Sequence, residues 1–454
     1  MSGQLTAEVD SPTEPGGAKA IAPGTRNGWL LVGAIVAVAL IVRVAYVIAT
    51  RHSYRPMTDA ADFDLIATSL AHGHGFGSAL VPPAVGPTSY RGPLYPLALS
   101  VVYAVFGHSW TLGRMEEAVF GTVLVLLIGI VSAELFDRRV ATVTMAIAAV
   151  YPTLILFGTS LQLEPLLAMV STAALAAALE HRRAPRGLLW PITSGVLIAL
   201  SIETREWGVA LILPVAWLIW TAQKDGKDKR WTMTALAAPI AVLGVTVVCL
   251  LPWTIRNEVR LHTFAPSSTS AGFTLAGTYN ATSAADPHYP TLWRPPYYDP
   301  TDAKILLSKP NPSEVWVDSQ MEKAAFDYIK AHPTYVFRVL YWNTVGLFDL
   351  DGTHIAFKDA PYIPYSLRFT RLAIYSSYVM ELLAIASFAL ARTRKVSKAI
   401  WVIPITTFFM IIALTGNIRY RAAIEPYTVL LAGGTVAAVI DRVKDRTKLG
   451  AAIS

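Results

Sequence analysis

Long apolar runs recur along most of the chain, and they constrain its fold more than any other feature. The first run, Trp29 to Thr50, is long enough to cross the hydrocarbon core of a bilayer, which is about 30 Å thick. Further runs lie near residues 113–135, 140–159, 165–180, 188–203, 207–222, 232–253, 371–391, 399–416 and 424–440. Together they predict an all-α polytopic membrane protein with about ten transmembrane helices.

The composition agrees with this prediction. Of the 454 residues, 54% are hydrophobic and only 15% are charged, which is too apolar for a soluble globular protein. The net charge is +7, but the basic residues cluster at the ends of apolar runs instead of forming a stripe with aromatic residues between them. This distribution argues against a nucleic-acid partner and for membrane lipids.

Basic residues gather in alternate connections between the runs, and this pattern predicts the topology. They are Arg138, Arg139, Arg182, Arg183, Arg186, Lys224, Lys227, Lys229, Arg230, Arg392, Arg394, Lys395, Lys398, Arg442, Lys444, Arg446 and Lys448. The positive-inside rule assigns these connections to the cytoplasm, so both termini are expected on the cytoplasmic side of the plasma membrane. The other connections, two of them long, are expected on the extracytoplasmic face.

Hydropathy and loop length divide the chain into five parts. Residues 1–25, rich in Gly, Pro, Ala and Thr, are expected to form a disordered cytoplasmic tail. An N-terminal transmembrane core at 26–253 contains a first long outward loop at 51–112, and an extracytoplasmic loop region follows at 254–368. C-terminal transmembrane helices at 369–441 end in a basic cytoplasmic tail at 442–454. Within 254–368, the spacing of Val317, Met321, Ala324, Ala325 and Tyr328 predicts a helix.

Three carboxylates, Asp59, Asp62 and Asp64, follow the first apolar run within a few residues. The next apolar residues have helical spacing and predict a short helix lying on the membrane: Ile66, Ala67, Leu70 and Ala71. Asp59 would then cap the helix and Asp64 would face water. A solvated loop without chemistry is the alternative for all three carboxylates.

Further ionisable residues are predicted at outward helix ends. Glu164 precedes Pro165, a pattern typical of a helix start, and capping is the alternative to a functional role for this acid. Arg205 beside Glu206 fits an ion pair or a ligand site. Outward arginines, which need anions, are Arg91, Arg205, Arg256, Arg260, Arg419 and Arg421. The alternate pair Arg419 and Arg421 suits a phosphate, with snorkelling as the competing explanation.

The order of several blocks resembles a known enzyme group. The blocks are "DAADFDLIATSLAHGHGF", "TSYRGPLYPLALSVVYAVFG", "LQLEPLL", "ETREWGVALILP", "LPWTIRNEVRLHTFAPSSTSAGFTLAGTYN" and "NIRYRAAIEP". They are similar to bacterial polyprenyl-phosphate-sugar-dependent glycosyltransferases of the GT-C fold, which include protein O-mannosyltransferase-like enzymes and aminoarabinose transferases. The resemblance extends from about Trp29 to Ile440 and rests on the order of the blocks.

The resemblance implies roles for individual residues. Asp59 matches an aspartate that acts on the acceptor, although Ala60 and Phe63 depart from the family pattern and leave Asp59 and Asp62 both open as the base. Arg91 matches a basic residue that contacts the lipid phosphate. The remaining matches are Glu164 for an acid before proline, Arg205 for an outward basic residue, and Arg419 or Arg421 for an arginine whose block departs here at Ala422 and Ala423.

The implied reaction moves a sugar from a polyprenyl-phosphate donor to a glycan, lipid or protein acceptor. Arginines would stabilise the departing phosphate and one carboxylate would accept the acceptor proton, so a direct displacement with inversion is expected. A divalent metal ion held by Glu164 and another acid is a further option, but no ligand spacing demands it. The alternative function is a lipid or polysaccharide transporter or flippase, which inverted repeats or paired broken helices would favour.

Overall fold

The computed structural model describes residues 26–77, 86–185, 187–222, 233–287, 290–351 and 367–453. Helices joined by turns and loops make up these ranges, with one isolated β-bridge between Gly77 and Pro87. Three of the sequence predictions fall outside the described residues: the disordered tail at 1–25, Arg186, and the basic connection that carries Lys224 to Arg230.

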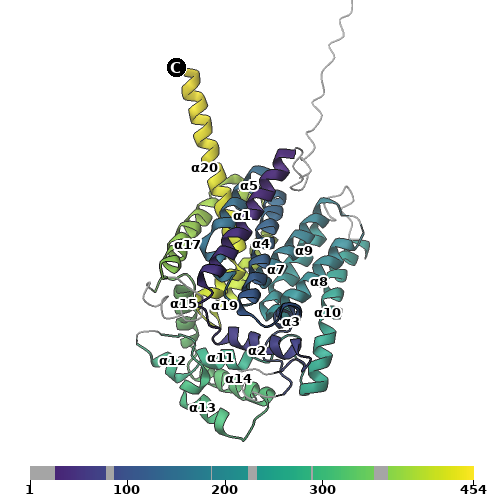
Figure 1. Cartoon of the computed structure of the whole chain (residues 1–454), viewed down its shortest axis with the longest axis vertical. Helices are drawn as coiled ribbons and strands as arrows, with labels where there is room; N and C mark the ends of the chain where they lie inside the picture. The colour runs from purple at the N-terminus through teal and green to yellow at the C-terminus, as the bar shows by residue number, and fades with distance from the viewer. Residues whose placement is uncertain are drawn as a thin grey trace, which may run out of the picture.

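A bundle of apolar helices forms the larger part of the molecule (Figure 1). Its members are α1 (Arg26–Thr50), α4 (Trp110–Leu135), α5 (Arg138–Val150), α6 (Pro152–Phe157), α7 (Glu164–Arg183), α8 (Leu189–Thr204), α9 (Ile212–Ala222), α10 (Met233–Leu261), α17 (Leu367–Ser387), α19 (Lys398–Ile412) and α20 (Glu425–Ile453). Every predicted apolar run therefore lies on one helix or on two consecutive helices. The all-α class is confirmed.

Among the residues that the structure describes, four helical segments are long and apolar enough to cross a membrane: Arg26–Thr50, Trp110–Leu135, Leu236–Leu261 and Arg368–Ser387. Shorter apolar helices span Leu94–Phe106, Leu189–Thr204, Glu206–Ala222 and Lys398–Ile412. These helices support a membrane location, while the count of about ten spans stays a prediction because several members fall below the usual spanning length.

Small residues let the helices of the bundle pack closely, and many large apolar residues lie on its surface. Helix α7 packs against α4, α8 and α9, and its inner face is rich in alanine, including Ala174 and Ala178, which lets neighbouring helices approach closely. Gly195 of α8 allows the same toward α10, because a Cβ atom there would lie 2.8 Å from the Val242 carbonyl oxygen. Outward-facing Leu213 is 77% exposed and Leu382 68% exposed, as expected for side chains that face lipid.

A layer of shorter helices covers one end of the bundle (Figure 1). It contains α2 (Asp59–Ala71), α11 (Ala271–Thr278), α12 (Ala281–Ala285), α13 (Pro300–Leu307) and α14 (Glu314–Ala331). The start of α1 and the end of α20 lie at the opposite end, so both described chain ends are on one side. That this side faces the cytoplasm stays a prediction. Helix α14 confirms the predicted helix, with Val317, Met321 and Ala325 buried.

The two long connections at 51–112 and 254–368 are more helical than hydropathy alone indicated. The loop at 51–112 contains α3 (Leu94–Phe106) as well as α2, and the region at 254–368 also contains α15 (Tyr335–Leu347) and the short helix η2 (Pro296–Tyr298). Helix α10 continues to Leu261, beyond the end of its apolar run at 253, and its last turns carry polar residues such as Arg256 and Asn257.

Candidate active site

Helix α2 begins at Asp59, but the Asp59 carboxylate does not cap it. The N-cap residue is Thr58, which has a φ of 48° and makes no capping hydrogen bond with its side chain. The two oxygens of Asp59 instead accept hydrogen bonds from Arg91 and Arg419, which come from distant parts of the chain. The expected capping role is therefore wrong, because two guanidinium groups hold the carboxylate.

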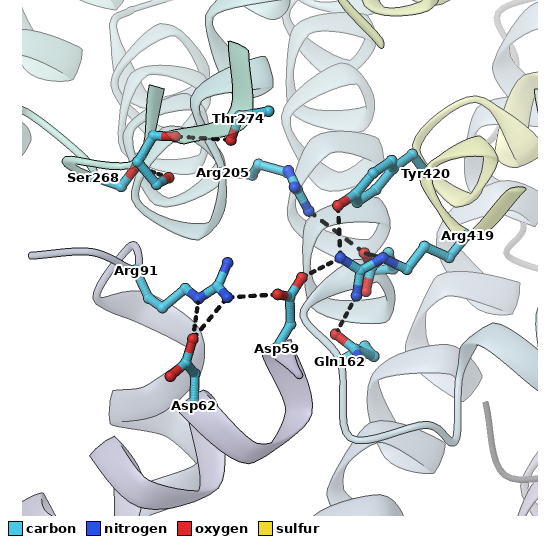
Figure 2. Close-up of polar contacts among 11 residues, drawn as sticks. Asp59, Asp62, Arg91, Gln162, Arg205, Ser268, Thr274, Arg419 and Tyr420 are labelled. Atoms are coloured by element: carbon cyan, nitrogen blue, oxygen red, sulfur yellow. Dashed lines mark hydrogen bonds and ion pairs between the residues drawn. The ribbon is translucent and has the colours of Figure 1, made fainter. Parts of the chain in front are cut away.

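Arg91 joins Asp59 and Asp62 of α2 (Figure 2). Its Nη2 lies 2.5 Å from Asp59 Oδ1 and 2.7 Å from Asp62 Oδ2, and its Nε lies 3.0 Å from the same Asp62 oxygen. Its guanidinium carbon also lies 4.6 Å from the centre of the Tyr90 ring. The Asp62 side chain is 1% exposed, whereas those of Asp59 and Arg91 are 17% and 15% exposed. Asp59 is thus the more accessible of the two aspartates.

Arg419 approaches Asp59 from the opposite side. It lies in η4 (Ile418–Ala423), and its Nη2 donates to Asp59 Oδ2 and, at 2.6 Å, to the Tyr420 hydroxyl. Its Nη1 donates to Gln162 Oε1 at 2.8 Å. Figure 2 shows the Arg419 guanidinium placed between Asp59, Gln162 and Tyr420. Residues 360 positions apart in the sequence therefore meet at one carboxylate.

Glu164 and Arg205 complete the cluster. Helix α7 begins at Glu164 with Pro165 in its first turn, as predicted. Glu164 Oε1 lies 3.5 Å from Arg205 Nη1 and 3.8 Å from Arg419 Nε, yet neither oxygen accepts a hydrogen bond from the described residues. The alternative that this carboxylate caps a helix is therefore not supported.

Aromatic rings hold Arg205 in place. Its guanidinium carbon lies 4.2 Å from the centres of both the Trp207 and the Tyr420 rings, at distances typical of cation–π contacts. Arg205 itself follows the last residue of α8 and has an extended backbone, which turns its side chain toward Glu164. The rings position this arginine without hydrogen bonds, and among the described residues only the 3.5 Å ion pair between its Nη1 and Glu164 engages its guanidinium N–H groups, so these donors can turn to an anionic ligand.

The cluster contains equal numbers of acidic and basic side chains: Asp59, Asp62 and Glu164 with Arg91, Arg205 and Arg419. Burial alone would raise the pKa of Asp59, but the charges of Arg419 and Arg91 outweigh it and hold that pKa well below its usual range. While both arginines contact it, Asp59 is an ionised carboxylate with little tendency to take up a proton.

A buried acid of α4 supports the loop that precedes α7. Glu117 accepts hydrogen bonds from the backbone N–H groups of Leu161, at 2.7 Å, and Gln162, and from the Tyr95 hydroxyl, at 2.7 Å. Leu161 has a φ of 55°, a conformation that non-glycine residues adopt rarely. Glu117 thereby fixes Gln162, which in turn contacts Arg419.

Several residues of this arrangement were not predicted from the sequence, among them Glu117, Gln162, Trp207 and Tyr420. A signal existed only for Glu117, since a carboxylate inside an apolar run is unusual and functional or structural reasons usually account for it.

Comparison with known proteins adds independent information. Residues 90–253 match the family model described as dolichyl-phosphate-mannose-protein mannosyltransferase. This range includes Arg91, Glu164 and Arg205, and it excludes Asp59 and Arg419. No curated protein sequence matches the chain significantly.

The chain is also similar to solved structures. The oligosaccharyltransferase of Archaeoglobus fulgidus, solved in complex with Zn and sulfate, has a TM-score of 0.50 and 14% identity, with 91% of this chain and 51% of that chain covered. The chain thus spans about half the length of that protein. It has a GT-C fold. The resemblance noted in the sequence is confirmed for the fold.

Two bacterial structures match this chain with lower TM-scores. ArnT from Cupriavidus metallidurans bound to undecaprenyl phosphate has a TM-score of 0.42 and 18% identity, with 91% of this chain and 79% of that chain covered. The arabinosyltransferase EmbB from Mycobacterium smegmatis has a TM-score of 0.36 and 14% identity, with coverages of 92% and 42%.

Arg421 lies in a different part of this GT-C fold. Its side chain is 1% exposed and contacts three carboxylates that take no part in the Asp59 cluster: Asp349 at 3.5 Å, Glu381 at 3.1 Å and Glu425 at 2.7 Å. The structure therefore brings together the predicted residues Asp59, Asp62, Arg91, Glu164, Arg205 and Arg419, and separates Arg421 from them.

The prediction that Asp64 faces water is wrong. Its side chain is 13% exposed and accepts hydrogen bonds from the Tyr103 hydroxyl at 2.6 Å and from Trp110 Nε1 at 3.1 Å. His108 Nε2 lies 2.9 Å from it as well. These partners come from α3 and the start of α4, so Asp64 ties α2 to the bundle instead of contributing to the arginine cluster.

The donor set does not match a metal site. Among the described residues, no group of three or more His, Cys, Asp or Glu side chains is arranged to hold one metal ion. Arginines surround Glu164 and Asp59, and their positive charges disfavour a divalent cation. The divalent metal ion considered from the sequence therefore stays a prediction that these charges disfavour.

Proposed function

We propose that the chain is a membrane glycosyltransferase that moves a sugar from a polyprenyl-phosphate donor to an extracytoplasmic acceptor by direct, inverting displacement. The observation that carries the proposal is the convergence of Arg91, Arg205 and Arg419 around Asp59, the most accessible of the three carboxylates on α2. Arginines recognise phosphate oxygens through paired N–H donors, and a neighbouring carboxylate is suited to accept a proton. The family match supports the same donor class.

The surroundings of Arg91 suit a phosphate that carries a long apolar chain. Helix α3 begins at Leu94, three residues after Arg91, and its outer face carries Val101, 62% exposed, and Phe106, 70% exposed. An isoprenoid chain lying along such a surface would bury apolar area while its phosphate reaches the arginines. The charged cluster and the exposed apolar helix are therefore adjacent, as a lipid-phosphate donor requires.

In the proposed reaction the acceptor hydroxyl oxygen attacks the anomeric carbon of the donor sugar. The bond between this carbon and the phosphate oxygen breaks, and its electron pair stays on the phosphate, whose negative charge Arg205, Arg91 and Arg419 stabilise. The acceptor proton goes to the Asp59 carboxylate. The products are the glycosylated acceptor and polyprenyl phosphate.

Donor binding would also make Asp59 a better base. In the protein alone, Arg91 and Arg419 hold the pKa of Asp59 well below its usual range, against the effect of burial. A donor phosphate that recruits these guanidinium groups would weaken their contacts with Asp59 and raise its proton affinity. Asp62 is less suited to this role, because it is 1% exposed and lies behind Arg91.

The test is a transfer assay with purified protein in detergent and a panel of radiolabelled polyprenyl-phosphate sugars. We expect one donor class to be consumed, with an anomeric configuration in the product, determined by NMR, opposite to that of the donor. Arg260→Met serves as a control, since Arg260 is an exposed arginine outside the cluster. Retention of configuration would refute direct displacement. If reconstituted protein translocated the lipid but consumed no donor, the transporter alternative would replace the proposal.

A further inference from the structure

The segment from Ser267 to Ser270 directs its side chains alternately to two sides. Ser267 and Thr269 are buried: Ser267 Oγ donates to the Ile202 carbonyl oxygen at 2.7 Å, and Thr269 Oγ1 donates to Glu314 Oε1 at 2.9 Å. Ser268 and Ser270 are only partly buried, and their hydroxyl oxygens lie 3.0 Å apart. The buried pair therefore anchors a segment whose other two hydroxyl groups remain accessible.

This segment lies beside the arginine cluster. The Thr269 backbone N–H donates to the Ser89 carbonyl oxygen at 2.9 Å, two residues before Arg91. Ser268 Oγ donates to Glu206 Oε1, and Glu206 directly follows Arg205. In the view of Figure 2, Ser268 lies on the side of Arg91 away from Asp62, and Arg205 lies between Ser268 and Arg419. Both connections bring the hydroxyl groups next to arginines that we assign to the donor phosphate.

Ser270 occupies a position at which serine usually stabilises a helix. It is the N-cap residue of α11, yet its side chain accepts no capping hydrogen bond. Its hydroxyl instead lies near Ser268 Oγ, which contacts the exposed carboxylate of Glu206. A purely local capping function therefore does not account for the orientation of Ser270.

The chemistry of the three side chains selects the ligand. A carboxylate accepts hydrogen bonds only, and each serine hydroxyl can both donate and accept, so together they suit a ligand with several hydroxyl groups. The negative charge of Glu206 disfavours a phosphate at this point, and the polar groups disfavour an isoprenoid chain. A sugar ring matches these requirements.

We propose that Glu206, Ser268 and Ser270 form the subsite for the sugar ring of the donor, next to the arginines that bind its phosphate. The proposal rests on the proposed function and extends it, because it assigns the residues that distinguish a sugar-bearing lipid from the bare lipid phosphate. Sites that hydrogen-bond substrate hydroxyl groups discriminate strongly against ligands that lack them, since the polar groups of the site then lose their partners.

The experiment compares two ligands and several variants by titration calorimetry in detergent. The ligands are the polyprenyl-phosphate sugar that the transfer assay identifies and polyprenyl phosphate without sugar. The variants are Glu206→Gln and the double variant Ser268→Ala with Ser270→Ala. Matched controls are Glu258→Gln, an exposed carboxylate on α10, and Ser319→Ala, whose hydroxyl bonds only to the Trp316 carbonyl oxygen of its own helix. Thermal melting verifies that each variant is folded.

We expect Glu206→Gln to lower the affinity for the sugar-bearing lipid by about 10-fold and to leave the affinity for the bare lipid phosphate unchanged. The serine double variant should act in the same direction, and the controls should bind both lipids like the wild type. If Glu206→Gln and the serine variant also bind both lipids with wild-type affinities, the subsite assignment is wrong although the proposed function stands. If the wild type binds neither lipid, both the proposed function and the subsite fail.

Discussion

Arg419 and Arg421 are two residues apart in one short helix, yet they belong to clusters of opposite character. Arg419 contacts Asp59 in a cluster of three acids and three arginines, at side chains that are 10% and 17% exposed. Arg421 is surrounded by Asp349, Glu381 and Glu425, and its side chain is 1% exposed. A 3₁₀-helix has three residues per turn, so residues two apart project in well-separated directions.

The difference teaches how to distinguish a binding arginine from a structural one. The cluster around Arg419 is accessible, balanced in charge, and includes Arg205, which aromatic rings hold while its N–H groups remain available. The cluster around Arg421 joins α17, α20 and the end of α15, and the side chains of Arg421, Asp349 and Glu425 are at most 2% exposed. We therefore infer that the first cluster performs chemistry and the second maintains the fold.

The largest effect is expected in the buried cluster. Arg421→Met removes the cation that Asp349, Glu381 and Glu425 share; the first and last of these are buried, and loss of one partner from a buried ion pair costs about 3–5 kcal/mol. Thermal melting in detergent should show a large loss of stability or failure to accumulate folded protein. The paired variant Arg419→Met should retain most of its stability and lose donor binding. If Arg421→Met melted like the wild type, the two clusters would not differ as described.

A smaller effect is expected when the cluster loses Arg205, whose side chain pairs with Glu164 at 3.5 Å and has no closer polar contact among the described residues. Arg205→Met should weaken binding of bare polyprenyl phosphate by about 10- to 100-fold, the range for one charge-assisted hydrogen bond, with little change in stability. Binding titrations measure the effect, with Arg260→Met as the exposed control. Equal loss of affinity in both variants would indicate a general charge effect instead of a specific phosphate site.

The smallest effect concerns acid stability. The pKa of Asp59 in the folded protein is lowered below its usual value of about 3.9, so its ionised form contributes stability above that value and the contribution disappears as the pH falls through the folded-state pKa. The difference in melting temperature between the wild type and Asp59→Asn should be constant above about pH 5 and should shrink below about pH 4. A difference that changed between pH 6 and 8 would mean that the pKa of Asp59 is not lowered.

The sequence predicted most helices correctly because apolar length is a direct requirement of a membrane-spanning helix. The same measure failed at α3 and at the end of α10. Helix α3 is only 13 residues long, and the last turns of α10 are polar, so neither has the hydropathy of a complete span. Helix α14 was predicted correctly because its apolar residues recur with helical spacing and form its buried face.

The site was predicted only in part. The order of sequence blocks gave Asp59, Arg91, Glu164, Arg205 and Arg419, but it could not separate Arg419 from Arg421, since that choice depends on the direction of each side chain in η4. Asp64 was assigned to water because its partners Tyr103 and Trp110 lie about 40 residues away in the sequence. Gln162 likewise gains its role only through Glu117 and Arg419.

The most direct test of the account measures sugar transfer and donor binding in Asp59→Asn, with Asp64→Asn and Asp62→Asn for comparison. Asn retains the size of the side chain and removes its charge, so donor binding should persist while the transfer rate falls by about 10²-fold or more. Asp64→Asn should transfer sugar at nearly the wild-type rate, because its carboxylate contacts Tyr103 and Trp110 and lies outside the cluster. Near-wild-type transfer by Asp59→Asn would contradict the account, and an inactive Asp62→Asn in the same experiment would identify Asp62 as the base.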